Sequence, residues 1–146
     1  SSTAATTTTT TRSDLAESEI LTRYKAQGGC FFVAVRYTTT DARDRQVIGC
    51  VGVRRCERRD DAPNTLEVFR LAVQETCRGQ GIGRQLLAMV ERFAHSKASP
   101  KLIANTLTCL EPALQAYESC GYQTEGDSPL GTLTMRTYFK LLSTNA

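Results

Sequence analysis

The hydrophobic period of this chain changes abruptly after Val73, and that change constrains the fold more than any other feature. Thr65–Val73 has the β-branched and aromatic composition of a strand. Gln74–Gly81 is polar and rich in glycine, and from Ile82 the apolar residues recur with a helical period (Ile82, Leu86, Met89, Val90, Phe93 and Ala94). The sequence therefore predicts a strand, a glycine-containing loop and a helix in direct succession.

Apolar runs separated by turn residues divide the rest of the chain into short elements. Before the loop we predict a helix that starts at the potential cap Ser13 and ends at Gly28-Gly29, then strands at 30–37, 46–54 and 65–73. After the helix from Ile82 we predict a strand at 101–109, a helix at 112–119, and strands at 122–125 and 132–141 around a turn at 126–131. This order of elements is that of one α/β or α+β domain.

The first part of the chain differs in composition from everything after it. Residues 1–12 are almost entirely Ser, Thr and Ala, and such a segment cannot bury enough apolar surface to offset the entropy of ordering it. We expect residues 1–12 to be a mobile tail and residues 13–146 to form the domain. The chain has 146 residues, of which 40% are apolar, and this suits a single domain with a real core.

Charge and hydropathy argue against membrane and nucleic-acid partners. The formal net charge is +3, and the densest basic run, Arg54–Arg59, is interrupted by Glu57 and followed by Asp60 and Asp61. A nucleic-acid surface carries charge of one sign interleaved with aromatic residues, and the sequence lacks that pattern. No apolar run approaches the roughly 18 residues of a membrane span, and there is no signal-peptide core. These observations favour a cytoplasmic protein, without excluding the nucleus.

Six cysteines and one histidine limit the metal and redox chemistry. No two cysteines have the two-residue spacing of zinc or redox motifs, and a single histidine, His95, disfavours a Cys/His metal cluster. Several cysteines lie in apolar segments, where a free thiol behaves as a small hydrophobe. We therefore expect no metal site, and reduced, buried thiols in a reducing compartment (Cys30, Cys50, Cys56, Cys77, Cys109 and Cys120).

The glycine-rich loop has the features of an anion site. Gly79, Gly81 and Gly83 allow positive φ and close approach of the backbone to a ligand. The first amides of the following helix have no internal partner and lie at the positive end of its dipole, an arrangement suited to phosphate. Arg78 and Arg84 add positive charge. The Walker loop is excluded because Gly83 is not followed by Lys-Ser/Thr, and the Gly-x-Gly-x-x-Gly fingerprint because position 84 is Arg. A loop for another nucleotide stays open.

Two segments together resemble the GNAT N-acetyltransferase superfamily. The first is Arg78-x-x-Gly81-x-Gly83, entered by Leu71-Ala72-Val73 and followed by an apolar helix, and the second contains Ala113, Tyr117, Gly121 and Tyr122. The resemblance covers about residues 30–140. It implies a mixed, mostly antiparallel central sheet, splayed into a V-shaped cofactor slot and with helices on both faces.

The resemblance also implies acetyl-CoA as the cosubstrate. Backbone groups of Leu71, Ala72 and Val73 would pair with pantetheine and the acetyl carbonyl. Amides of the loop would hold the pyrophosphate (Arg78, Gly79, Gln80, Gly81, Ile82, Gly83 and Arg84). Many relatives have Asn three residues before the alanine that matches Ala113, whereas this chain has Leu110 there. We therefore expect one polar cofactor contact to be missing.

Acetyl transfer to an amine needs a proton acceptor for the amine and a donor for the departing sulfur. By the resemblance, Tyr117 is the candidate acid; alternatively, it is a core tyrosine packed with Ala113 and Leu114. Glu67 is the candidate base; alternatively, it is a strand carboxylate that pairs with Arg70 or with the hairpin. Glu111 is a weaker candidate base. For the remaining reactive groups we expect structural roles, with His95 on the surface and Cys109 as a buried thiol rather than a nucleophile.

The function predicted from the sequence is acetyl transfer from acetyl-CoA directly to a primary amine, without a covalent enzyme intermediate. The alternative is a non-catalytic acyl-CoA-binding module, which Leu110 and the uncertain base make worth testing. The acceptor, a small amine or a protein amine, stays open at this stage. So does the oligomeric state, with a dimer among the possibilities.

Overall fold

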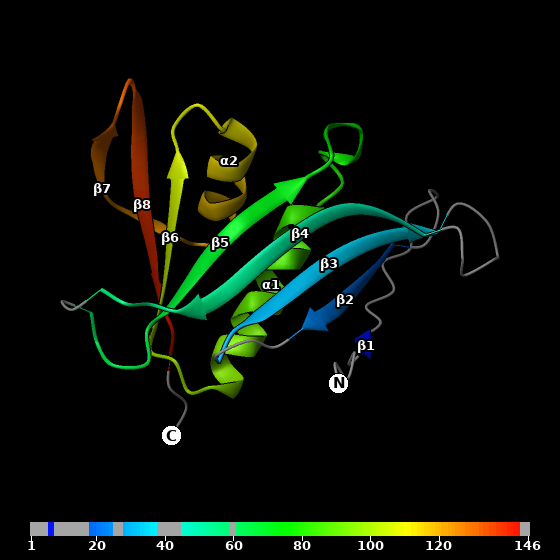
Figure 1. Ribbon diagram of the computed structural model, residues 1–146, viewed down its shortest axis with the longest axis horizontal. Coiled ribbons are helices and arrows are strands. Elements are labelled where there is room, and N and C mark those ends of the chain that lie inside the picture. The colour runs from blue at the N-terminus through cyan, green and yellow to red at the C-terminus, as the bar shows by residue number, and fades with distance from the viewer. Residues whose placement is uncertain (1–5, 8–17, 25–27, 38–44, 59–60, 144–146) are drawn as a thin grey trace.

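The computed structural model describes residues 6–7, 18–24, 28–37, 45–58 and 61–143. These residues form one sheet and two α-helices (Figure 1). A single 3-10 turn, η1, covers Glu75–Cys77. The sheet has the order β1-β2-β3-β4-β5-β6-β8-β7. The element bounds are β1 Thr6–Thr7, β2 Ser18–Tyr24, β3 Cys30–Tyr37, β4 Arg45–Arg55, β5 Leu66–Val73, α1 Ile82–Ser96, β6 Lys101–Leu107, α2 Glu111–Ser119, β7 Gln123–Leu130 and β8 Leu133–Leu141.

The sheet opens between its two central strands, β5 and β6. They are the only parallel neighbours among the described strands, and they pair only where Leu66–Val68 lies beside Leu102–Ala104. Beyond these residues β5 continues along β4 and β6 continues along β8, so the two strands diverge towards their carboxyl ends (Figure 1). This divergence confirms the predicted mixed, mostly antiparallel sheet with a V-shaped slot.

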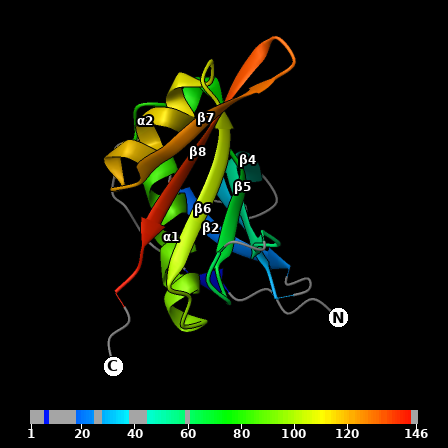
Figure 2. The ribbon, with the colours of Figure 1, turned by 90° about the vertical axis from the view of Figure 1, so that its left-hand side faces the viewer.

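Both described helices lie on the same face of the sheet. Helix α1 packs on β3, β4 and β5 and also contacts α2, and Figure 2 shows both helices on one side of the strands. The predicted apolar stripe of α1 is buried, including Leu86 and Val90, and it shares one core cluster with Tyr117 of α2. The expected helices on both faces are therefore not seen among the described residues, in which Ser18–Tyr24 of the predicted first helix is a strand.

The predicted helix from Ser13 is wrong over its described part. Ser18–Tyr24 forms β2, which pairs antiparallel with β3 from Ser18 opposite Arg36 to Tyr24 opposite Phe31. Pairing with a neighbouring strand satisfies the backbone groups and overrides a weak helical preference, and Ile20 and Thr22 are β-branched residues that suit a strand. Residues 13–17 and 25–27 lie outside the described part.

The predicted tail also contains a strand. Thr6 and Thr7 form β1, opposite Leu21 and Ile20 of β2. Because β2 offers its outer edge to the backbone, even a short threonine segment gains ladder hydrogen bonds there. The other residues of 1–12 lie outside the described residues, so the tail stays a prediction for them.

The last hairpin differs from the expected strand, turn and strand. The structure extends β7 through the predicted turn to Leu130, opposite Leu133 of β8, and the chain reverses at Gly131. Gly126 lies at a register shift instead of in a turn, because a glycine inside a strand also suits a bulge. All eight residues of β7 are exposed, so cross-strand pairing, rather than burial, forms this arm.

Candidate active site

The glycine-rich loop ends as the N-terminal cap of α1. Gly79 and Gly81 have φ values of 79° and 80°, in the left-handed region that favours glycine. A Cβ at either position would meet no atom within 4 Å, so the backbone here borders open space. The amide of Gln85 donates to the carbonyl of Gly81, which leaves the amides of 82–84 as the unpaired first turn of the helix. These amides form a ready anion site.

Short-range contacts hold the loop in place. The Nε of Arg78 donates to the carbonyl of Val73 at 3.1 Å, which ties the loop back to the end of β5. The amide of Gln74 donates to the carbonyl of Ile48 at 2.7 Å. Cys77 is fully buried beneath the loop. Because Arg78 is engaged in this way, its guanidinium serves first to shape the loop.

The start of α1 joins the loop, the end of β5 and helix α2 in one place. A Cβ on Gly83 would lie 3.5 Å from the Cβ of Ala116 and 3.8 Å from Cγ2 of Val73. Ala116 precedes Tyr117 on α2, and Val73 ends the predicted pantetheine segment. The two motifs that are separated in the sequence are therefore adjacent in space.

The slot begins at a bulge in β5. Arg70 has a φ of 55°, unusual for a residue other than glycine, and it lies where the β4–β5 register shifts. Beyond the bulge, Ala72 and Val73 lie opposite Cys50 and Gly49 of β4. Since β6 stops pairing with β5 at Val68, the other edge of 69–73 has no strand beside it among the described residues. A ligand in the slot can hydrogen-bond to that edge.

Tyr117 lies in a cluster of three tyrosines. Its ring is 2% exposed, 5.2 Å from the ring centroid of Tyr122 and 5.5 Å from that of Tyr138. Burial, followed by the nearby Tyr138, raises the pKa of the Tyr117 hydroxyl above its ordinary value. The hydroxyl therefore keeps its proton at neutral pH and is available as a donor. The alternative role, a core tyrosine, holds at the same time because the ring is part of the core cluster.

Glu67 lies on the sheet face opposite the helices. Its side chain is 20% exposed and accepts two hydrogen bonds of 3.4 Å from Arg54 of β4, through Nε and Nη2. The expected alternative partner on the hairpin is thus present, and it is Arg54 instead of Arg70. The guanidinium carbon of Arg54 lies 4.5 Å from the ring centroid of Phe69.

The sequence model of the acetyltransferase (GNAT) family matches residues 4–122. The chain belongs to this family. The match includes both segments described above, the loop at the start of α1 and the segment around Tyr117, and it begins within the predicted tail.

Curated relatives are about one third identical to this chain over the aligned segments. Human N-acetyltransferase 8 is 30% identical over 119 residues, which cover 82% of this chain and 48% of the relative. Zebrafish (Danio rerio) N-acetylaspartate synthetase is 33% identical over 109 residues, 75% of this chain and 35% of the relative. The chain therefore spans about half the length, or less, of these relatives.

Solved GNAT structures share the fold at lower identity. A Bacillus anthracis protein assigned as a streptothricin acetyltransferase, solved with acetyl coenzyme A, superposes with a TM-score of 0.67 at 17% identity, covering 82% of this chain and 66% of that chain. The NatC complex bound to Gag peptide and CoA gives a TM-score of 0.65 at 20% identity, with 77% and 71% covered. At this identity the likeness shows the fold alone.

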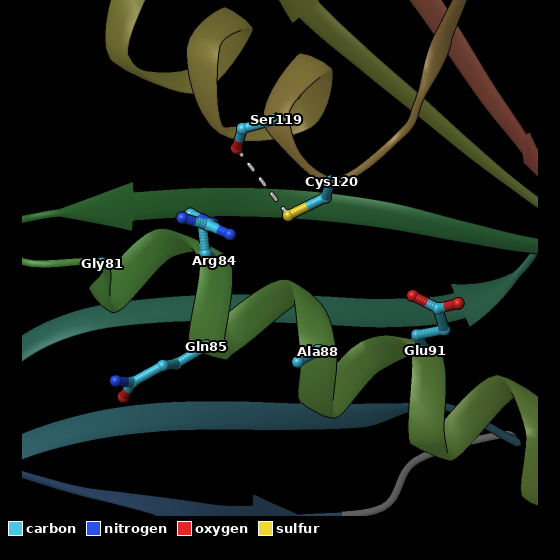
Figure 3. A pocket seen from close by; sticks show the side chains of 7 residues that line it. All are labelled: Gly81, Arg84, Gln85, Ala88, Glu91, Ser119 and Cys120. Atoms are coloured by element: carbon cyan, nitrogen blue, oxygen red, sulfur yellow. Dashed lines mark hydrogen bonds between the residues drawn. The ribbon is translucent and has the colours of Figure 1, made fainter. Parts of the chain in front are cut away.

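A pocket extends from the glycine-rich loop along α1 and α2. It has a volume of about 440 Å³ and lies between α1 and the end of α2 (Figure 3). Arg84 points from α1 towards α2 across this pocket (Figure 3). The lining residues are Gly81, Arg84, Gln85, Ala88, Glu91, Ser119 and Cys120.

The start of α2 departs from the family pattern as the sequence indicated. Leu110 is the N-cap residue, is 49% exposed and makes no side-chain capping hydrogen bond. Glu111 follows as the first helical residue and is exposed. Unlike an Asn, Leu110 has no polar side-chain atom to offer at this position, while its carbonyl accepts the amide of Ala113 at 3.0 Å.

The remaining reactive side chains divide between surface and interior. His95 is exposed, as predicted, with its Nε2 3.9 Å from Glu91. All six cysteines are free, but the prediction that they are buried holds only for Cys30 and Cys77. Cys109 is exposed because it lies in the turn after β6, beyond the end of the predicted strand. Within the described residues no three His, Cys, Asp or Glu side chains gather as a metal site.

No α-helix in the described part of the chain is both long and apolar enough to span a bilayer.

Sequence reasoning missed Arg54, Phe69 and Gly52, which lie with Glu67 on the same face of the sheet. One signal was available, because Gly52 interrupts an otherwise apolar strand and a glycine there often marks close approach of another group.

Proposed function

We propose that this GNAT domain transfers an acetyl group from acetyl-CoA directly to a primary amine. The observation that supports the proposal is the meeting of Gly83, Val73 and Ala116, which brings the proposed anion site beside the end of β5 and beside the helix that carries Tyr117. An acyl-CoA has a phosphate end, an amide-bearing pantetheine arm and a thioester. In the proposed complex, the helix amides receive the phosphate end, the strand edge pairs with the arm, and Tyr117 lies towards the thioester.

The proposed binding mode uses backbone groups more than side chains. The amides at Gly79, Gly81 and 82–84 would receive the pyrophosphate. The free edge of Leu71–Val73 would pair with the pantetheine amides as another strand would. The pocket beside Arg84 offers room for the rest of the nucleotide. The domain is proposed to comprise residues 13–146 together with the short strand β1, in a reducing compartment such as the cytoplasm, where six free cysteines are expected.

The proposed reaction is attack of the neutral amine on the thioester carbonyl. A C–N bond forms, the C–S bond breaks, and the products are the amide and CoA with a free thiol. Tyr117 would give its proton to the departing sulfur as the C–S bond breaks, and would regain a proton from solvent before the next turnover. Glu67, on the opposite face and partly exposed, would take the proton of the amine through water. No covalent enzyme intermediate is required.

The experiment measures cofactor binding and turnover separately. Calorimetry with acetyl-CoA, ATP and NAD tests the site, and we expect a response to acetyl-CoA only. A thiol reagent then follows CoA release with a panel of small amines, amino acids, lysine peptides and free N-termini. CoA release that depends on an acceptor, together with an acetylated product, supports the enzyme. Binding of ATP or NAD without acetyl-CoA would contradict the site assignment.

The second candidate is a non-catalytic acyl-CoA-binding module. Two observations favour it: Leu110 replaces the usual polar contact, and Glu67 is engaged by Arg54. If the protein binds acetyl-CoA tightly but acetylates nothing in the panel, the module is the better description. Tyr117→Phe separates the two further, because it should lower turnover in an enzyme and leave binding unchanged in both.

A further inference from the structure

Arg54 is held in a fixed place on the sheet face that carries Glu67. Val51 and Val53 of β4 face the helical core, so Gly52 and Arg54 face the other side. The ring of Phe69 on β5 packs against Gly52 so closely that a Cβ there would come within 2.4 Å of it. Phe31 supports this ring at a centroid distance of 6.3 Å. The guanidinium of Arg54 then lies over the ring, 4.5 Å from its centroid.

The contacts with Phe69 and Glu67 make Arg54 a pre-organised cation. Stacking on an aromatic ring restricts the guanidinium plane, so less entropy is lost when the group binds an anion. Glu67 restrains it from a second side with two bonds of 3.4 Å.

The positive charge of Arg54 is only partly used. The bonds to Glu67 involve Nε and Nη2 and are long, and the arginine side chain is 55% exposed. A long contact with a largely exposed arginine contributes little. The Nη1 edge has no partner among the described residues, and a guanidinium can donate a second parallel pair of hydrogen bonds to a carboxylate.

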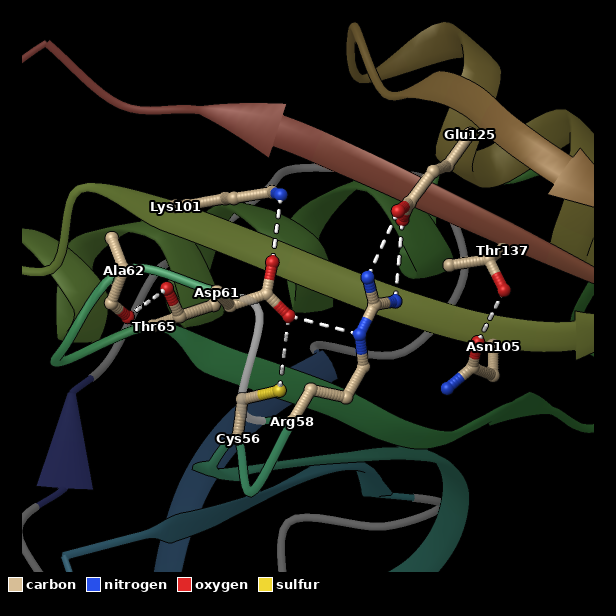
Figure 4. Close-up of polar contacts among 9 residues, drawn as sticks. All are labelled: Cys56, Arg58, Asp61, Ala62, Thr65, Lys101, Asn105, Glu125 and Thr137. Atoms are coloured by element: carbon tan, nitrogen blue, oxygen red, sulfur yellow. Dashed lines mark hydrogen bonds and ion pairs between the residues drawn. The ribbon is translucent and has the colours of Figure 1, made fainter.

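Neighbouring cations are engaged much more tightly. Arg58 lies 2.9 Å from Asp61 and 2.8 Å from Glu125, and Lys101 lies 2.9 Å from Asp61 (Figure 4). The Asp61 side chain is 4% exposed, so its pairs with Arg58 and Lys101 are shielded on the carboxylate side, whereas Arg58 and Glu125 are 40% and 37% exposed. Unlike Arg58 and Lys101, Arg54 therefore keeps N–H donors, on its Nη1 edge, that a ligand anion could use.

We propose that the acceptor amine carries a carboxylate next to its amino group, and that Arg54 binds this carboxylate. A cation and a carboxylate side by side on one face are complementary to the ammonium and carboxylate of an amino acid. Arg54 holds the acid end, and Glu67 faces the amino end. A lysine side chain or a protein N-terminus lacks that nearby carboxylate. The inference rests on the proposed acetyl transfer and names its acceptor class.

The test compares each amino acid with its carboxamide, which differ in the anionic charge. CoA release is measured for wild type, Arg54→Met, Arg54→Lys and Arg55→Met. Methionine keeps an aliphatic side chain over Phe69, and Arg55 is a matched control because it is exposed and adjacent but alternates to the other face.

We expect wild type to prefer the acid over the amide by at least tenfold in kcat/KM. Arg54→Met should abolish that preference by raising the KM for the amino acid, while the KM for acetyl-CoA stays unchanged. Arg54→Lys should restore part of it, since a lysine keeps the charge but loses the fork. Arg55→Met should keep the wild-type preference. Equal or better use of the amide by wild type, or a preference that survives in Arg54→Met, overturns the inference.

A separate measurement keeps this result distinct from failure of the proposed function. If acetyl-CoA binds but no acceptor is acetylated, the transferase assignment fails. Calorimetry with CoA present and the product pair, an N-acetyl amino acid and its carboxamide, still tests Arg54. Tighter binding of the acid, lost in Arg54→Met, supports the anion site. Equal binding of the two products by wild type overturns it.

Discussion

Replacing Gly81 by alanine tests whether the helix amides hold the pyrophosphate. Gly81 has a φ of 80° and caps α1, and a Cβ there would meet no atom within 4 Å. The substitution therefore introduces backbone strain without a steric clash. An alanine relieves that strain by turning its peptide towards ordinary φ values, and this turn re-aims the amides of the loop.

The strain should cost about 1–2 kcal/mol, the usual penalty for an L-residue in the left-handed region. For a chain of this size, 1 kcal/mol corresponds to a melting-temperature change of roughly 3–4 °C. Gly28→Ala is the matched control, because Gly28 has a φ of 78°, also borders open space and lies outside the loop. Both variants should melt a few degrees below wild type.

Cofactor affinity should separate the two variants. We expect Gly81→Ala to weaken acetyl-CoA binding by about tenfold or more, since charge-assisted hydrogen bonds are worth roughly 1.5–3 kcal/mol each. Gly28→Ala should bind as wild type does. S-acetylpantetheine, which lacks the pyrophosphate, should be used equally well by all three proteins. Wild-type acetyl-CoA affinity in a folded Gly81→Ala would refute the assignment, and so would an equal loss with S-acetylpantetheine.

Four further outcomes are expected. Tyr117→Phe should lower kcat by about 100-fold or more while the KM for acetyl-CoA and the melting temperature change little, because the ring stays in place and only the proton donor is lost; an unchanged kcat removes Tyr117 as the acid. Tyr122→Phe should raise stability by about 1 kcal/mol in denaturant unfolding, since its buried hydroxyl has no partner among the described residues; a loss of stability would mean that the hydroxyl is bonded. Leu110→Asn should tighten acetyl-CoA binding in calorimetry and leave the melting temperature nearly unchanged, because Pro112 has no amide to be capped and the amide of Ala113 already donates to the carbonyl of residue 110. Burial raises the pKa of Tyr117 and Tyr122 in the folded state, so as the pH rises these tyrosines ionise first in the unfolded chain. The free energy of unfolding should therefore fall above about pH 10 by up to about 1.4 kcal/mol per pH unit for each of the two residues. Urea melts at pH 9, 10 and 11 should show a smaller fall when either tyrosine is replaced by phenylalanine.

Local signals in the sequence were sufficient for the elements that flank the site. The bounds of β3 and the start of α1 agree with the predictions, because an alternating apolar run and a helical stripe each express the environment of their own segment. The glycine-rich loop was predictable for a related reason. Gly81 is required by a local backbone conformation, so its cause lies within a few residues of the chain.

The tertiary structure decided what depends on neighbours far along the chain. Ser18–Tyr24 is a strand because β3 offers an edge to pair with, and nothing within that segment states this. Glu67 could be predicted as a strand carboxylate, but its partner Arg54 is 13 residues away, and register across the β4–β5 ladder brings the two together. The burial of Tyr117 arises likewise from Tyr122 and Tyr138. The sequence by itself thus determined where the glycine-rich loop and its helix begin, and packing determined which side chains surround the slot, because pairing and burial are set by the whole sheet rather than by any one segment.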